Sequence, residues 1–542
     1  MTPPPSPLIA TASPSIPQSN TSIFPITAPS SSPTHDLIPT PIVSNVHPMQ
    51  TRLKSGISKK KVAFTFTKPD YLDVEPPSFT IAKALPPWID AMKEEFSAFH
   101  QQGTWSLVPA TPSMNLVNCK WVYKIKRNAD GSVSRYKARL VAKGFHQQAG
   151  INYDEMFSPV VKPTTVRIIL TLAAQFNWPL RQLDISNAFL HGFLKEDVHM
   201  VQPPGFVDAS KPAHVCKLHK SLYGLKQAPR SWFERFTTQL ESLGFTASIA
   251  NPSLFILQTP QATLYLLLYV DDIIITGTSQ SFISDLISQL KTTFELKDLG
   301  PLHYFLDLQL QYHDQGFSVH QTKYATNLLN RFKMFNCKPS STPYSSTTKL
   351  TKSNSPTLSD PTQFRSLVGV LQYLTFTHPD LSFAVNHICQ FMHSPTEDHL
   401  MVAKRILHYL RGTLHCVLLF QPSSLKLQGY VDADWAGDQS DRRSTSALLP
   451  LRLNYFGFEM ILKDLGVFLA DSPILWCDNL SALALASNPM FHTRTKHIEV
   501  DYHFVCEKVV RRDIVVKFVS TKDQLADILI QVSRLFKLYT PP

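Results

Sequence analysis

Two adjacent aspartates, Asp271 and Asp272, directly follow the longest apolar run of the chain, which extends from Leu264 to Val270. A second apolar stretch, residues 273–276, comes immediately after them. Apolar strands on both sides of the doublet predict a tight hairpin with two carboxylates at its tip. Two like charges beside buried strands are unfavourable unless a cation lies near them. The doublet therefore indicates a cation site, and an ordinary turn is the equally frequent alternative.

A third carboxylate is placed to complete such a site. Asp184 directly follows residues 179–183 and precedes the apolar stretch 188–190. If its strand lies beside the hairpin, Asp184 and Asp271 can hold two Mg²⁺ ions about 3.5–4 Å apart. Mg²⁺ prefers oxygen ligands of this kind, and Mn²⁺ is the alternative ion. The sequence thus predicts a site for two divalent metal ions.

Cations alternate with apolar residues along 120–127 and 135–143, on either side of the turn signal at 128–131. One face of the predicted hairpin carries Lys120, Lys124, Lys126, Arg135, Lys137, Arg139 and Lys143. The other face carries Trp121, Tyr123, Ile125, Tyr136, Ala138, Leu140 and Ala142. A face with a single sign of charge suits a nucleoside triphosphate or a template backbone. The alternative is the polar outer face of an ordinary hairpin.

The charge of the whole chain fits a polyanionic partner. Its 542 residues include 52 Lys and Arg against 41 Asp and Glu, which gives a net charge of +11. Charge alone does not show whether that partner is nucleic acid or anionic lipid. It is also compatible with a soluble basic protein that has no polyanionic partner. No apolar stretch approaches the roughly 20 residues that span a bilayer, and no signal-peptide pattern is present. The seven cysteines show no zinc-ligand or redox-pair spacing. We therefore expect an intracellular protein of the cytoplasm or nucleus, not secreted and without a membrane partner.

Composition also divides the chain. Residues 1–62 are rich in Pro, Ser and Thr and are predicted to be disordered, because they contain too little apolar surface to offset the entropy of ordering. A globular pattern follows, and the segment from Trp88 to His100 has apolar residues at helical spacing. A shift to Ser, Thr, Pro and Lys at 339–361 predicts a boundary. A helical region follows it, and a strand-like block starts near residue 425.

Several longer motifs carry a specific resemblance. They are TWSLVP at 104–109, CKWVYKIKRNADGSVSRYKARLVAKGFHQ at 119–147, QLDISNAFLHG at 182–192, SLYGLKQAPRSW at 221–232, LYVDDIIITG at 268–277 and LKDLGPLHYFL at 296–306. These stretches resemble the copia-type (Pseudoviridae) retrotransposon Pol polyproteins, especially their plant members. The resemblance implies an α+β fold in five parts. These are a disordered linker at 1–62, an N-terminal extension of the polymerase at 63–100, a reverse transcriptase with fingers, palm and thumb at 101–345, a helical connection at 346–424 and a truncated ribonuclease H-like α/β domain at 425–542.

The resemblance implies an RNA-directed DNA polymerase that adds deoxynucleotides to the primer of an RNA or DNA template–primer duplex. Asp184 and Asp271 would hold two Mg²⁺ ions, and Asp272 would be the third catalytic residue. Lys137 and Arg139 would contact the triphosphate of the incoming deoxynucleotide. The sequence makes no prediction of oligomeric state.

Three further positions follow from the same resemblance. Phe189 matches the aromatic residue that excludes a ribose 2′-hydroxyl, although a plain core phenylalanine is an equally frequent reading of such a residue. Gln227 would lie beneath the incoming nucleotide and the template base. Asp307 stands where the family usually has glycine, so we expect an altered contact between the thumb and the primer.

The C-terminal block resembles the ribonuclease H domain of the same polyproteins. Asp432, Asp478 and Asp501 match three of its four metal-binding carboxylates. The helix that should carry the fourth, a glutamate, is missing after Ser446, and Glu459 lies in the wrong sequence context. We therefore expect a remnant without nuclease activity. The alternative for the whole chain is a degraded, non-catalytic relic that still binds nucleic acid.

Overall fold

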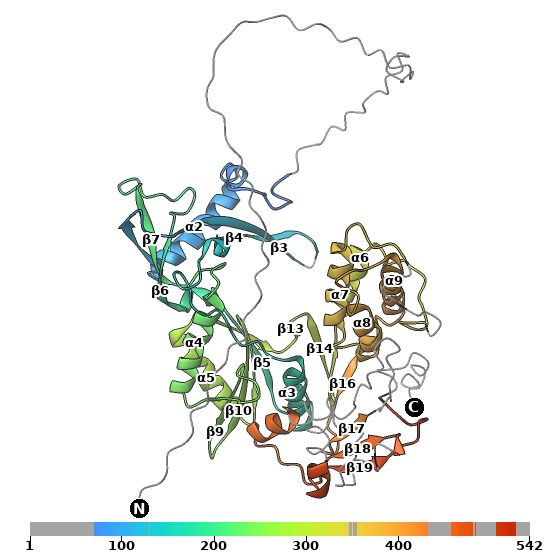
Figure 1. The fold of residues 1–542 in the computed structure, drawn as a ribbon. Helices are drawn as coiled ribbons and strands as arrows, with labels where there is room; N and C mark the ends of the chain where they lie inside the picture. Colours follow the sequence, from blue (N-terminus) through green and yellow to red (C-terminus); the bar gives the residue numbers. More distant parts are fainter. Residues whose placement is uncertain are drawn as a thin grey trace, which may run out of the picture. The chain divides into compact units, whose positions relative to one another are not determined.

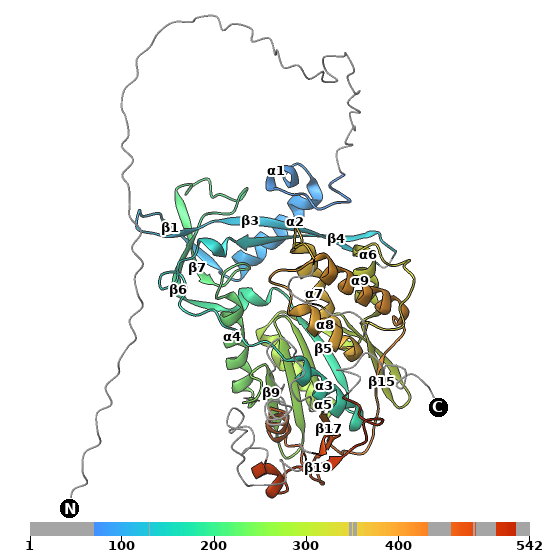
Figure 2. The same ribbon diagram turned by 45° about the vertical axis from the view of Figure 1, so that its right-hand side comes forward.

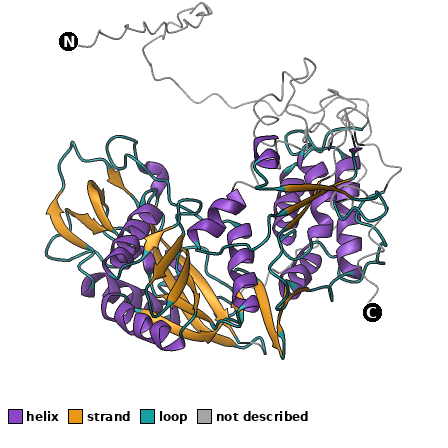
Figure 3. Ribbon diagram, turned by 90° about the horizontal axis from the view of Figure 1, so that it is seen from below, coloured by secondary structure: helices purple, strands orange, loops and turns teal. Residues whose placement is uncertain are grey.

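The computed structural model describes residues 70–128, 130–345, 350, 355–431, 457–480, 483 and 506–526 (Figures 1 and 2). The predicted linker at 1–62 lies outside these residues, as do Asp432 and Asp501. Helices and strands are both abundant in the described ranges, so the mixed helix-and-sheet class is confirmed (Figure 3). None of the helices in these ranges is long and apolar enough to cross a membrane.

The first substructure is built around the basic hairpin. Its elements are α1 (Phe79–Ala82), α2 (Pro86–Gln101), β3 (Cys119–Arg127), β4 (Val133–Ala142), η1 (Gly144–His146) and the sheet β1-β7-β6-β2, made of β1 (Trp105–Pro109), β7 (His214–Lys220), β6 (Phe193–Met200) and β2 (Leu116–Val117). Strands β3 and β4 pair antiparallel, with Lys124 opposite Lys137. Directly opposite residues share a face, so the cations gather on one side of the hairpin. The predicted hairpin and its two faces are confirmed.

The apolar face of the hairpin packs on α2. The Trp88 ring lies edge-on to Tyr123 and Tyr136, with ring centroids 5.2 and 4.9 Å apart. Leu140 on β4 and Trp88 on α2 are both fully buried. The helix predicted over Trp88 to His100 is confirmed, and its apolar stripe is what attaches it to the hairpin.

The central sheet has the order β12-β5-β11-β10-β9-β8. Its strands are β12 (Leu296–Pro301), β5 (Leu180–Ile185), β11 (Asp272–Gly277), β10 (Thr263–Tyr269), β9 (Leu254–Gln258) and β8 (Thr246–Ala247). Alternate residues of its strands enter two different cores. Leu183 and Ile273 pack with α4 (Ala228–Ser242) and α5 (Gln280–Thr293), whereas Leu180 and Ile274 pack with α3 (Pro163–Gln175). Burial on both faces explains why β9, β10 and β11 are nearly continuous apolar runs.

A second helical substructure follows the central sheet. It contains α6 (Thr322–Arg331), α7 (Thr362–Leu374), η3 (Pro379–Leu381), α8 (Ser382–Cys389) and α9 (Glu397–Gly412), beside the sheet β13-β14-β15-β16 of β13 (Tyr304–Phe305), β14 (Leu308–His313), β15 (Gly316–His320) and β16 (Leu418–Phe420). Leu328 of α6 shares one core with Leu367 of α7 and Ile406 of α9. The helical cluster therefore begins with α6, within the range 101–345, and contacts cross the composition shift at 339–361.

The described C-terminal residues divide between two places. Strands β17 (Gln428–Val431), β18 (Ile474–Cys477) and β19 (Val515–Phe518) form a parallel sheet in the order β17-β18-β19. The helical residues 457–464 instead pack on the central sheet, where Ile461, Leu462 and Leu465 join the same core as α3.

Candidate functional site

The aspartate doublet lies at the tip of the β10–β11 hairpin, as predicted. Tyr269 pairs with Asp272 across the turn, and Val270 has a φ of +55°. A β-branched residue rarely adopts this left-handed conformation, so the turn is strained and needs support from its surroundings. The indole Nε1 of Trp232 supplies that support by donating a hydrogen bond to the carbonyl oxygen of Val270 at 2.6 Å.

Asp184 lies directly beside the doublet. Strand β5 pairs antiparallel with β11 and places Asp184 opposite Asp272. The backbone N–H of Ile185 also donates to the carbonyl oxygen of Asp271 at 3.0 Å. The structure therefore brings together the three carboxylates that the sequence placed on separate stretches.

The electrostatics of these carboxylates favour a cation. Burial raises the pKa of Asp271, and the nearby Asp184 raises it further. Burial, Asp271 and Asp184 together raise the pKa of Asp272 to about 6, which a hydrogen bond from Gln182 opposes. Asp184 thus makes ionisation of Asp271 harder, and both make ionisation of Asp272 harder. Bound divalent ions would relieve that repulsion.

A cavity of about 400 Å³ lies between this turn, α2 and β4. Asp184 and Asp271 line it on one side, and Lys137 and Arg139 of β4 line it on another. The guanidinium of Arg139 lies 4.7 Å from the ring centroid of Tyr223. Carboxylates opposite cations around a space of this size can accept a polyphosphate together with divalent cations.

The donor set suits magnesium held jointly with a substrate. In the described part of the chain, no three His, Cys, Asp or Glu side chains converge closely enough to hold a metal by themselves. Mg²⁺ is usually bound by one or two carboxylates that are completed by substrate phosphates and water. Asp184 and Asp271 fit that pattern, whereas Asp272 is not among the residues that line the cavity.

Comparison with known proteins decides the family. A family model described as "Reverse transcriptase (RNA-dependent DNA polymerase)" matches residues 102–346. The Retrovirus-related Pol polyprotein from transposon RE1 of Arabidopsis thaliana is 42% identical over 522 residues, which are 90% of this chain and 35% of that protein. A putative transposon Ty5-1 protein of Saccharomyces cerevisiae is 30% identical over 272 residues, which are 50% of this chain and 88% of that protein. The chain belongs to the copia-type retrotransposon Pol family.

Other relatives agree with this assignment. The Retrovirus-related Pol polyprotein from transposon TNT 1-94 of Nicotiana tabacum is 38% identical and covers 82% of this chain and 36% of that protein. The chain thus spans about a third of the length of the plant Pol polyproteins that it matches. Among solved structures, the protease–reverse transcriptase of prototype foamy virus is similar at a TM-score of 0.23 and 11% identity, over 78% of this chain and 52% of that chain.

Two residues that the Pol resemblance assigns to nucleotide contact lie outside the described wall of the cavity. Phe189, in η2 (Ala188–His191), is half-buried and packs edge-on against Tyr223 at 5.0 Å. Gln227 is 1% exposed, accepts a hydrogen bond from Nε2 of Gln147 at 2.9 Å and donates to the carbonyl oxygen of Asn152 at 2.8 Å. Their contact with a nucleotide stays a prediction.

Three functional candidates were missed from the sequence. Tyr223 and Trp232 both lie inside the Pol motif SLYGLKQAPRSW, so the motif marks them, but their residue types give no hint of a role. Glu95 lies on the cavity wall from α2, outside every motif. Only the packing of α2 along β4 brings Glu95 to the site.

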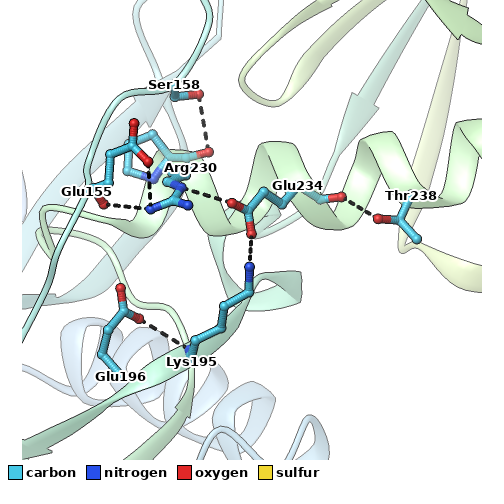
Figure 4. A network of polar contacts seen from close by, with 8 residues as sticks. Glu155, Ser158, Lys195, Glu196, Arg230, Glu234 and Thr238 are labelled. Atoms are coloured by element: carbon cyan, nitrogen blue, oxygen red, sulfur yellow. Dashed lines mark hydrogen bonds and ion pairs between the residues drawn. The ribbon is translucent and has the colours of Figure 1, made fainter. Parts of the chain in front are cut away.

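Polar contacts fix the start of α4, which carries Trp232 and follows directly after Gln227 (Figure 4). Arg230 pairs with Glu234 at 2.9 Å and with Glu155 at 3.3 Å. Lys195 of β6 pairs with the other oxygen of Glu234 at 2.9 Å. Partly exposed ion pairs contribute only about 0–1 kcal/mol each, so this network orients α4 more than it stabilises the fold.

Of the three candidate nuclease aspartates, only Asp478 lies in the described part of the chain. Val431 of β17 pairs in parallel with Cys477 of β18, and Asp478 follows β18 directly. Asp478 is half-buried. Glu459 forms an ion pair with Nζ of Lys508 at 3.6 Å, so its carboxylate already has a cationic partner in the chain.

Trp232→Phe tests the support of the strained turn. The variant keeps an aromatic ring but removes the hydrogen bond to Val270. If the site extends a primer, as proposed below, we expect kcat to fall about ten-fold, the equivalent of about 1.4 kcal/mol. Single-nucleotide extension and thermal unfolding measure the effect. The control is Trp178→Phe, whose ring packs on Phe176 and Tyr265. Equal losses of activity in the two variants would argue against a specific role of the Trp232 indole.

Proposed function

We propose that this chain is an RNA-directed DNA polymerase that adds deoxynucleotides to the 3′-hydroxyl of a primer with release of pyrophosphate. The observation that carries the proposal is a single cavity lined by Asp184 and Asp271 on one side and by Lys137 and Arg139 on another. Phosphoryl transfer between a primer and a triphosphate needs these two kinds of group in one place. An RNA or DNA template–primer duplex is the macromolecular substrate.

The side chains of the cavity have two roles, binding of the triphosphate and binding of the metal ions. Lys137 and Arg139 bind the oxygens of the triphosphate and orient it, and the ring of Tyr223 beneath Arg139 keeps that guanidinium in place. Asp184 and Asp271 would hold two Mg²⁺ ions. When bound, these ions would activate the primer hydroxyl and stabilise charge on the transferred phosphoryl group.

The contact with the primer differs from the usual family pattern at Asp307. Leu306 and Asp307 have φ values of +48° and +58° in the turn between β13 and β14, a conformation that glycine adopts most easily. The phenol of Tyr304 donates a hydrogen bond to Oδ1 of Asp307 at 2.5 Å. We propose that this hydrogen bond stabilises the turn in place of the missing glycine, at the cost of a negative charge near the primer backbone.

The C-terminal remnant is proposed to be inactive as a nuclease. The sheet β17-β18-β19 retains the strands before Asp432 and Asp478, but the sequence has no counterpart of the glutamate-bearing helix. We expect the RNA strand of a labelled RNA–DNA hybrid to stay intact with purified protein and Mg²⁺. Degradation that Asp432→Asn abolishes would contradict this expectation.

Primer extension by the purified full chain tests the proposed polymerase. The reaction contains an RNA template, a labelled DNA primer, four deoxynucleotides and Mg²⁺. We expect a ladder of products that a chelator abolishes, that added Mg²⁺ restores and that dideoxynucleotides truncate. Tight binding of the duplex without extension under any of these conditions would overturn the proposal and support the non-catalytic relic.

A further inference from the structure

A buried carboxyl group, Glu95 of α2, lies on the cavity wall and has no part in the mechanism above. We propose that Glu95 is the counter-charge of Lys137 and Arg139 in the nucleotide-free protein. A deoxynucleoside triphosphate then takes over these cations, and Glu95 takes up a proton from solvent. The inference rests on the proposed function, because it assigns the triphosphate to this cavity.

The position of Glu95 follows from the pattern of α2. Ala91, Glu95 and Ala98 all line the cavity, at the spacing of one helix face. Trp88 and Met92 point into the core beneath the hairpin. Helix α2 thus contributes Glu95 to the wall of the cavity, about one turn from each of the small residues Ala91 and Ala98.

The surroundings of Glu95 are unusual for a carboxylate. The residue is 7% exposed, and its Oε1 has no hydrogen-bond partner among the described residues. A buried ionised oxygen without a partner is strongly unfavourable. Nearby cations therefore favour the ionised form, and any ligand that competes for them shifts the carboxyl group toward its neutral form.

The charges around Glu95 place this balance near neutral pH. Burial raises the pKa of Glu95 to about 7, while Lys137, Arg139 and a hydrogen bond from the backbone of Leu140 lower it. Desolvation in turn lowers the pKa of Lys137, as do Arg139 and Arg135. The other charged groups on the cavity wall are Glu94 of α2, Asp184 and Asp271 of the central site, and Glu295 and Lys297 near and on β12.

A triphosphate changes this balance in one direction. Its negative charges occupy Lys137 and Arg139 and repel an ionised Glu95, so the bound state favours the protonated acid. Linkage then requires that proton uptake at Glu95 accompany nucleotide binding and that nucleotide affinity fall as pH rises through 7. A neutral side chain at this position removes both effects.

Calorimetry on a stalled complex tests the inference without catalysis. The full chain is bound to a template–primer whose primer ends in a dideoxynucleotide, and the next complementary deoxynucleotide is titrated in with Mg²⁺. Titrations at pH 7 in two buffers of different ionisation enthalpy count the protons taken up. We expect about half a proton, because a group with a pKa near 7 is half ionised there.

Glu95→Gln supplies the comparison. We expect this variant to show no such uptake and to bind the nucleotide about ten-fold more tightly than the wild type at pH 8, with Kd values within about two-fold of each other at pH 6. The control is Asp90→Asn on the same helix, where an exposed carboxylate pairs with Lys93 at 3.7 Å. It should match the wild type at both pH values.

The outcomes separate the two proposals. No nucleotide binding by the wild type would overturn the proposed polymerase itself. Nucleotide binding with equal proton uptake in wild type and Glu95→Gln, or weaker binding by the variant at both pH values, would overturn only the role of Glu95. If thermal unfolding shows that the variant does not fold, the wild-type proton count still decides, because zero uptake at pH 7 contradicts the inference.

Discussion

Replacement of Asp271 by asparagine is expected to lower primer extension about 10³-fold or more while the template–primer duplex still binds. Asparagine has almost the same shape, so the hairpin turn and its hydrogen bond to Trp232 should survive. The substitution removes a negative charge that would hold a divalent ion, and charge stabilisation of that kind contributes several kcal/mol to the transition state, about one factor of ten per 1.4 kcal/mol. Single-turnover extension and duplex binding measure the two parts separately.

The same substitution should not destabilise the fold. Burial and Asp184 raise the pKa of Asp271 in the folded chain above its unfolded value. A carboxyl group with a raised folded pKa destabilises the native state once pH exceeds its unfolded pKa, because the unfolded chain ionises more easily. Neutral asparagine removes that penalty, so at pH 7 the melting temperature in the absence of metal should be equal to or higher than that of the wild type.

The matched control is Asp285→Asn, an exposed carboxylate on α5. It makes the same chemical change on an exposed face of the next helix and should leave extension and melting temperature unaltered. If Asp271→Asn extends primers at a rate within ten-fold of the wild type, the Asp271 carboxylate has no catalytic role. A large fall in its melting temperature would show that Asp271 is structural.

Local patterns in the sequence were sufficient for the elements that carry the chemistry. The alternation around Lys124 and Lys137 predicts the hairpin and its charged face, since the period of two residues fixes which side chains share a side. The apolar runs around Asp271 predict β10, the turn and β11. The neighbourhood of Asp184 and Asp271 required one further assumption, that their strands are adjacent, and the β5–β11 pairing confirms it.

What the sequence did not predict depends on contacts between distant segments. Glu95 has no distinctive neighbours along the chain, and its burial arises only because α2 packs along β4. Gln227 has its amide satisfied by Gln147 and Asn152, two residues of a loop whose path no periodic pattern predicts. The resemblance assigns residues 457–464 to a nuclease-like domain at 425–542, yet this helical segment packs on the central sheet.

That packing predicts that a substitution at the C-terminal end of this helical segment weakens the polymerase. Leu465 is 1% exposed in the core shared with α3 and the central sheet, and its carbonyl oxygen accepts a hydrogen bond from the phenol of Tyr265 at 2.7 Å. One residue earlier, Oδ2 of Asp464 accepts a hydrogen bond from Oγ of Ser248 at 2.7 Å. The segment therefore covers part of the core formed by α3 and the central sheet, and it accepts hydrogen bonds from Tyr265 and Ser248.

Leu465→Ala should cost about 2–5 kcal/mol, the range for removing a buried leucine side chain. The missing side chain leaves a void in the core shared with α3 and the central sheet. The loss of stability should therefore appear both as faster heat inactivation of primer extension and as a lower unfolding midpoint. The control is Phe468→Ala, three residues later, whose ring is 88% exposed and should be removable without effect. If extension by both variants survives heating as well as the wild type, residues 457–465 do not stabilise the polymerase. A selective loss in Leu465→Ala would mean that residues 457–465 stabilise the proposed polymerase.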